Sequence, residues 1–83
     1  MVRNLAVAHI LINCDSGFER EIIDQLKTID GVKEARSIFG AYDIIIKIER
    51  PTHERLRDMI AWKISKINHV RTTLTLLGIE SQM

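Results

Sequence analysis

The sequence repeats itself at an offset of 38 residues, and this repeat constrains the fold more than any other feature. Residues 29–40 (IDGVKEARSIFG) align with residues 67–78 (INHVRTTLTLLG) and share Ile, Val and Gly at equivalent positions. At the same offset Ile22 aligns with Ile60, and the first strand-like segment aligns with the third. Chance similarity between two short amphipathic units is the alternative, but the repeat favours two copies of one β-α-β unit.

Four segments have the composition of β-strands, because they are rich in apolar and β-branched residues and are bounded by turn-forming residues. They cover residues 5–14, 32–40, 43–49 and 70–79. Only Ala41 and Tyr42 separate the second segment from the third, which predicts a two-residue hairpin between them.

Two helices are predicted between these strands. Ser16 and Glu19 have the S-x-x-E spacing of a capping box, so the first helix should begin at Ser16 and stop at Asp30-Gly31. The second should begin at Pro51 or Thr52 and end near Asn68. Each helix carries one apolar stripe, formed by Phe18, Ile22, Leu26 and Ile29 in the first helix and by Leu56, Met59, Ile60, Ile64 and Ile67 in the second.

The order βαββαβ predicts an α+β protein with the ferredoxin-like fold. Two β-α-β units with right-handed crossovers, joined by a hairpin, give a four-stranded antiparallel sheet of order 4-1-3-2 with both helices on one face. A chain of 83 residues has room for one hydrophobic core. Residues 1–83 should therefore form a single domain and not a multi-domain enzyme.

This topology gathers polar groups at one edge of the sheet. The end of the first strand (Asn13, Cys14), the start of the first helix (Asp15, Ser16), the hairpin 40–43 and residues 69–73 should meet there. The Asp43 carboxylate, the Tyr42 phenol, the Thr72 and Thr73 hydroxyls and free backbone amides could together hold an ammonium and a carboxylate group. In the alternative interpretation Asp43 only fixes the hairpin and Tyr42 only packs.

The sheet face away from the helices is predicted to be apolar, although a monomer would need a polar surface there. A patch of this kind predicts a two-fold homodimer with sheet packed on sheet. The residues expected in that interface are Val7, His9, Leu11, Leu74 and Leu76. Trp62 lies off the main stripe of the second helix, so that it either anchors a second contact or covers the core beside Met59.

The composition argues against several kinds of partner. Twelve Lys and Arg against 11 Asp and Glu leave a net charge of +1, with no surplus to neutralise phosphates or an anionic membrane. His9, His53 and His69 lack metal-ligand spacing, and no phosphate-binding or dinucleotide-binding glycine motif occurs. We expect no cofactor, no metal, no membrane contact and no direct nucleic-acid partner. The single cysteine, Cys14, fits a reducing cytoplasm as a small buried side chain and not as a catalytic thiol.

Three segments carry a family likeness: IDGVKEA at 29–35, GAYD at 40–43 followed by three isoleucines, and NHVRTTLT at 68–75. The G-x-Y-D hairpin and the T-x-T of the last strand are the most specific parts. In this order and spacing the chain resembles the ligand-binding domain of the Lrp/AsnC, or feast/famine, transcriptional regulators, over nearly its whole length.

The resemblance implies a dimer through the open sheet face, higher rings of dimers and a small effector, typically an amino acid, bound between dimers. By position, Gly40, Ala41, Tyr42 and Asp43 match the hairpin motif, whereas Thr73, Thr75 and Leu76 match the strand segment implicated in effector response. His69 stands where the repeat has Gly31 and where the family often has Gly, so the backbone before the last strand is expected to differ.

Full-length members of the family begin with a helix-turn-helix, which this sequence lacks before its first strand. The resemblance therefore implies a stand-alone form that senses an amino acid alone or co-assembles with a full-length Lrp/AsnC regulator. Our main hypothesis is a non-catalytic sensing and oligomerisation module linked to transcriptional regulation. Two rivals stay open: a small dimeric ferredoxin-like α+β-barrel enzyme, which would need an acid or base in a closed pocket between sheet and helices, and a purely structural assembly partner.

Overall fold

The computed structural model describes residues 5–77 and contains the predicted βαββαβ order. The strands are β1 (Ala6–Cys14), β2 (Val32–Ser37), β3 (Ile44–Arg50) and β4 (Val70–Leu77). The helices are α1 (Glu19–Leu26) and α2 (His53–Met59), and α2 continues into a π-helical turn, η1 (Ile60–Ile64). The sheet order β2-β3-β1-β4 is the predicted order read from its other end, and all three strand pairs are antiparallel. The ferredoxin-like fold is confirmed.

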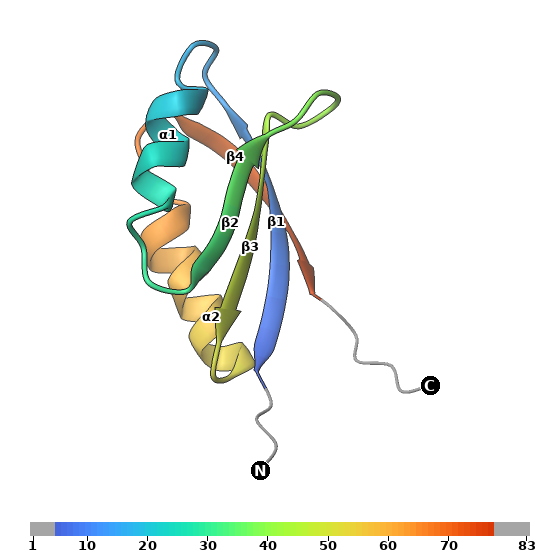
Figure 1. The fold of residues 1–83 in the computed structure, drawn as a ribbon, viewed down its shortest axis with the longest axis vertical. Helices are drawn as coiled ribbons and strands as arrows, with labels where there is room; N and C mark the ends of the chain where they lie inside the picture. The colour runs from blue at the N-terminus through green and yellow to red at the C-terminus, as the bar shows by residue number, and fades with distance from the viewer. Residues whose placement is uncertain (1–4, 78–83) are drawn as a thin grey trace.

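Both helices cover the same face of the sheet, and the hydrophobic core lies between them and that face (Figure 1). The alternation of the central strands decides which side chains are buried, because successive residues of a strand point to opposite faces. On the covered face β1 and β3 contribute mainly isoleucines, and each helix contributes its apolar stripe. The largest fully buried side chains are Ile10, Ile12, Ile22, Leu26, Ile44, Ile46, Ile48, Leu56 and Ile64.

The helix boundaries differ from the predictions in two places. The predicted capping box is wrong. The helix α1 begins at Glu19, and its N-cap residue, Phe18, makes no side-chain hydrogen bond to the first turn. The Glu19 side chain does reach back toward the preceding turn, where its Oε1 accepts a hydrogen bond from the Gly17 N–H at 3.2 Å. Ser16, however, lies in that turn before the helix and is not its N-cap. The second helix begins as predicted, with the Thr52 hydroxyl accepting from the Arg55 N–H, but its helical part ends at Ile64 and not near Asn68.

The hairpin is also longer than predicted. β2 ends at Ser37 instead of Gly40, and β3 begins at Ile44, so the connection spans residues 38–43 instead of two residues. The Ile38 N–H donates to the Asp43 carbonyl at 2.9 Å, which closes this loop. The Phe39 side chain is fully exposed in this loop. No buried apolar side chain there would favour continuing β2 as far as Gly40. The predicted continuation of the last strand to Ile79 falls outside the described residues.

The backbone before β4 does not differ from the equivalent backbone before β2, contrary to expectation. His69 has φ +76° and Gly31 has φ +100°, so both repeats enter their strands through the left-handed region. His69 is held there by its neighbours: its ring stacks on Phe18 with centroids 3.6 Å apart, and its Nδ1 lies 3.2 Å from Asp15 Oδ2. Histidine tolerates this conformation better than most non-glycine residues.

Candidate functional site

The predicted edge of the sheet is assembled as the topology requires. Two backbone hydrogen bonds of 2.9 Å join segments distant in sequence, one from the Asp15 N–H to the His69 carbonyl and one from the Asp43 N–H to the Ile12 carbonyl. The loops after β1 and after β2 both lie at the upper end of the molecule in Figure 1. The end of β1, the start of α1, the loop 38–43 and the start of β4 therefore meet at one place.

Asp43 is the central residue of this edge. Its Oδ2 accepts a hydrogen bond from the Cys14 N–H at 2.9 Å, although the two residues are 29 positions apart. The carboxylate thus fixes the loop to the end of β1, as the alternative interpretation required. Asp43 also lines an open cleft of about 370 Å³, which we call the edge cleft. Its lining residues are Asn13, Cys14, Asp43, Arg71 and Thr72.

A small charged network borders the edge cleft. Asp15 faces both His69, at 3.2 Å, and the Arg71 guanidinium, at 3.9 Å. The contact to Arg71 is long and the Arg71 side chain is 68 % exposed, so this ion pair contributes little stability. Arg71 is therefore only loosely held, whereas Asp15 also has its shorter contact with His69.

Cys14 is unsuited to nucleophilic chemistry. Burial in the first place, and then the negative charge of Asp43, Glu19 and Asp15, raise the pKa of the Cys14 thiol from 9.0 to about 11. The thiolate is the reactive form, so the side chain stays protonated and inert near neutral pH. This agrees with the prediction of a small buried side chain.

We expect iodoacetamide to alkylate Cys14 in the folded protein at pH 8 about 100-fold more slowly than in urea, because the raised pKa lowers the thiolate fraction by that factor. Mass spectrometry of timed samples measures both rates. Equal rates in the two conditions would contradict the assignment of Cys14 to a desolvated, negatively charged environment.

The other predicted site residues separate into two groups. Gly40 and Ala41 are exposed and Tyr42 is half-buried, all on the loop beside Asp43. The strand register instead places Thr73 opposite Ile12 and Thr75 opposite Ile10, which puts both threonines on the helix-covered face and outside the edge cleft. Of the two hydroxyls expected at this edge, the cleft receives Thr72 and not Thr73, and it also receives Arg71, which the sequence did not single out as a binding residue.

The open face of the sheet carries all five predicted interface residues. Leu11 lies opposite Ile45 on one side and Leu74 on the other, and His9 lies opposite Leu76. Leu74 and Leu76 are 43 % and 47 % exposed. The remaining charges of this face lie toward β2, in the pairs Glu34–Arg36 and Lys47–Glu49, each 3.8 Å apart. The face is thus an apolar stripe, completed by the half-buried Val7, with a charged border.

The hydrophobic core fills the space between the sheet and the helices. Among residues 5–77 no polar or charged residue is buried, and the core there consists of apolar side chains. Within the same residues no three His, Cys, Asp or Glu side chains are grouped closely enough to hold a metal ion. No helix in this part of the chain is long and apolar enough to cross a membrane.

Fold, edge cleft and open apolar face together define a small ferredoxin-like domain, whose candidate binding groups lie at the sheet edge. The chain belongs to the Lrp/AsnC ligand-binding domain family, whose model matches residues 7–81. The crystal structure of FFRP-DM1 superposes with a TM-score of 0.86 at 36 % identity, covering 89 % of this chain and 99 % of that one. E. coli AsnC superposes with a TM-score of 0.85 at 25 % identity, and the match covers 94 % of this chain but 53 % of AsnC.

A relative of another kind matches the same region. Homocitrate synthase from Saccharolobus islandicus is 37 % identical over 74 residues, which is 88 % of this chain. The chain spans only 16 % of that enzyme's length. The similarity therefore covers a small part of the synthase.

Proposed function

We propose that this domain is a non-catalytic sensing and assembly module in transcriptional regulation. It binds an amino-acid effector at the edge cleft, and it associates through the open sheet face into dimers and then into a ring of dimers. The observation that carries the proposal is the presence of Asp43 and Arg71 in one cleft, because an amino acid presents an ammonium and a carboxylate that need opposite charges.

The two charges have different tasks in this proposal. Asp43 is already anchored by the Cys14 N–H, so its charge is fixed in position before the ammonium group arrives. Arg71 is loosely paired with Asp15 and swings to the ligand carboxylate. Gly40, Ala41 and Tyr42 border the ligand from the loop, and a neighbouring dimer closes the open side. Thr73 and Thr75 act indirectly, by packing the strand that carries Arg71 and Thr72.

A thermal-shift screen against the twenty amino acids tests this role. A ligand at 100 times its dissociation constant adds roughly 2.7 kcal/mol to the stability of the native state. Each kcal/mol raises the Tm of a domain of this size by about 4 to 8 °C. We expect at least one amino acid to raise the Tm at millimolar concentration. The variant Asp43→Asn keeps an oxygen for the Cys14 N–H but loses the charge, and should lose the shift.

Asp24→Asn is the matched control, because Asp24 is an exposed carboxylate on α1, outside both the edge cleft and the other hollow of the described residues. It should keep the wild-type response. If no amino acid shifts the wild type, the structural-partner interpretation becomes the better one. If Asp43→Asn folds and responds with unchanged affinity, the effector binds elsewhere.

The similarity to homocitrate synthase supports a second role, in which the same domain senses an effector for a metabolic enzyme. The two roles differ in the partner: a full-length Lrp/AsnC regulator in the first, and an enzyme in the second. Size-exclusion chromatography of the domain with each purified protein distinguishes them. Our proposal predicts co-elution with the regulator, whereas co-elution with the synthase alone would favour the second role.

A further inference from the structure

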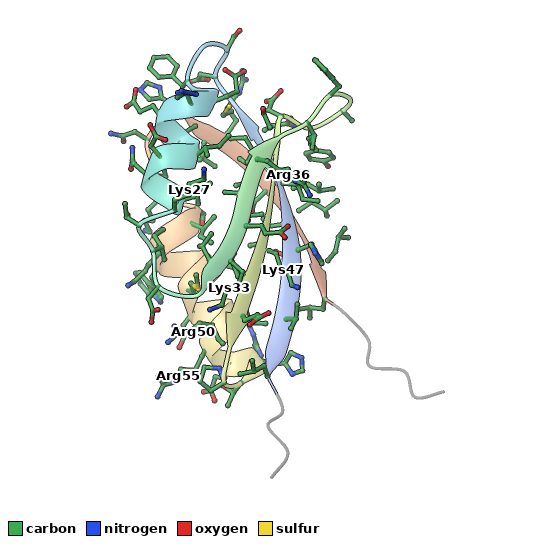
Figure 2. All side chains as sticks on the ribbon, viewed as in Figure 1. Lys27, Lys33, Arg36, Lys47, Arg50 and Arg55 are labelled. Atoms are coloured by element: carbon green, nitrogen blue, oxygen red, sulfur yellow. The ribbon has the colours of Figure 1, made fainter. Side chains whose placement is uncertain are left out.

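A second hollow lies at the opposite end of the sheet from the edge cleft. β3 begins beside Asp43 and ends at Arg50, so the two hollows are separated by the length of this strand. The second hollow has a volume of about 320 Å³, and we call it the helix-side groove. Figure 2 shows Arg50 and Arg55 there, near the start of α2. Its lining residues are Asp30, Arg50, Arg55, Asp58, Met59, Trp62 and Lys63.

The π-helical turn η1 forms one wall of this groove. The Ser65 N–H donates to the Ile60 carbonyl at 3.0 Å, five residues back, and the Ser65 hydroxyl donates to the same carbonyl at 2.8 Å. Single π turns within helices are rare and occur frequently at functional sites. This turn carries Trp62 and Lys63, both of which line the groove.

Trp62 is an exposed aromatic wall and not a cover for the core. It is the only tryptophan of the chain and is 69 % exposed, whereas Met59 beside it is 7 % exposed. The ammonium of Lys66 lies 5.2 Å from the centroid of the Trp62 ring. A large exposed aromatic side chain bordering a hollow provides a surface on which a planar apolar group can pack.

The charges of the groove leave a positive excess. Arg50 is paired with Asp30, which lies 3.3 Å from its guanidinium, and its stem lies over Gly31, where an added Cβ would be 2.9 Å from Arg50 Cδ. Arg55, Asp58 and Lys63 form no ion pair with any residue of the described range 5–77. The groove lining therefore holds two unpaired cations, Arg55 and Lys63, and one unpaired carboxylate, Asp58, beside the apolar side chains of Met59 and Trp62.

We propose that the helix-side groove binds an organic carboxylate that carries a planar apolar group. The ring packs against Trp62 and Met59, and the carboxylate meets Arg55 and Lys63. The volume suits a small molecule, since such sites usually measure about 300 to 1,000 Å³. This site is separate from the edge cleft and does not depend on the effector proposed there.

Fluorescence of the single tryptophan reports on this groove directly. The probe is phenylacetate, which has a ring and a carboxylate, and its matched control is phenylacetamide, which has the same ring and no charge. We expect phenylacetate to change the Trp62 emission saturably at millimolar concentration. Phenylacetamide, Arg55→Gln and Lys63→Gln should each weaken binding about tenfold, because each removes a charge-assisted contact.

Chemical-shift mapping with ¹⁵N-labelled protein locates the site independently. Phenylacetate should perturb the amides of residues 30–31, 50 and 52–63, and Asp24→Asn, at an exposed position of α1 outside both hollows, should leave its affinity unchanged. The proposal is overturned if the emission does not saturate, if phenylacetamide binds equally well, or if the perturbed amides lie at residues 40–43. An emission that changes with protein concentration alone would also overturn it, since a second copy of the chain would then occupy the groove.

Discussion

Replacing Leu11 by Asp should abolish the proposed sheet-on-sheet dimer and leave a monomer that still folds. Leu11 lies at the centre of the open sheet face, between Ile45 and Leu74. In the proposed dimer each Å² of apolar surface buried there would contribute about 25 cal/mol. A carboxylate at this position would be buried without a partner in the dimer, at a cost of several kcal/mol. In the monomer the same side chain reaches water, because Leu11 is only half-buried there.

Size-exclusion chromatography with light scattering measures the outcome, and circular dichroism shows whether the monomer is folded. Phe39→Asp is the control, because it makes the same change from apolar to charged at a fully exposed loop position outside the sheet. That variant should stay at least dimeric. A wild-type protein that is monomeric at micromolar concentration would contradict the sheet-on-sheet association.

Replacing Gly31 by Ala should destabilise the domain by about 2 to 3 kcal/mol, the sum of backbone strain and steric overlap. Gly31 has φ +100°, and an added Cβ would lie 2.9 Å from Arg50 Cδ and 3.1 Å from the Glu49 carbonyl oxygen. The backbone oxygen is part of the sheet and cannot move aside. The free energy of unfolding in urea measures the loss.

The equivalent position of the other repeat should behave differently. His69→Gly relieves the strain of φ +76° but loses the stacking on Phe18 and the contact with Asp15, so the two effects should nearly cancel, within about 1 kcal/mol. His69→Ala keeps the strained φ and loses the contacts, and should cost about 2 kcal/mol. Equal losses for the two variants would show that the backbone at this position is not strained.

The sequence predicted the arrangement of the elements more reliably than their ends. Sheet order follows from the repeat and from strand alternation, which reflect the burial of many side chains at once. Element ends depend on single contacts. S-x-x-E at Ser16 predicted a cap, but Glu19 bonds to Gly17 instead, and the loop 38–43 closes through one bond from Ile38 to the Asp43 carbonyl.

The sequence predicted the location of the candidate site at the sheet edge, but not the full set of side chains that line the cleft there. Topology alone brings Asp43 to the end of β1. Topology also brings Thr72 and Thr73 to this edge, whereas Thr75 was chosen only by matching a motif. The strand register decides that Thr73 and Thr75 face the helices while Thr72 pairs with Asn13. Arg71 carried no signal in the sequence, because its value as a binding residue depends on its weak contact with Asp15.

The strand β3 sets the distance between the edge cleft and the helix-side groove. This strand has seven residues and runs from the edge cleft to the helix-side groove, a length of about 23 Å at 3.3 Å per residue. A shift of the strand register by one residue would turn Ile44, Ile46 and Ile48 out of the core, so the register of β3 is fixed. The spacing between the two ends is therefore fixed within one copy. In the proposed assembly, ligand binding at either end would therefore act on the rest of the protein through the loops or through contacts with neighbouring copies.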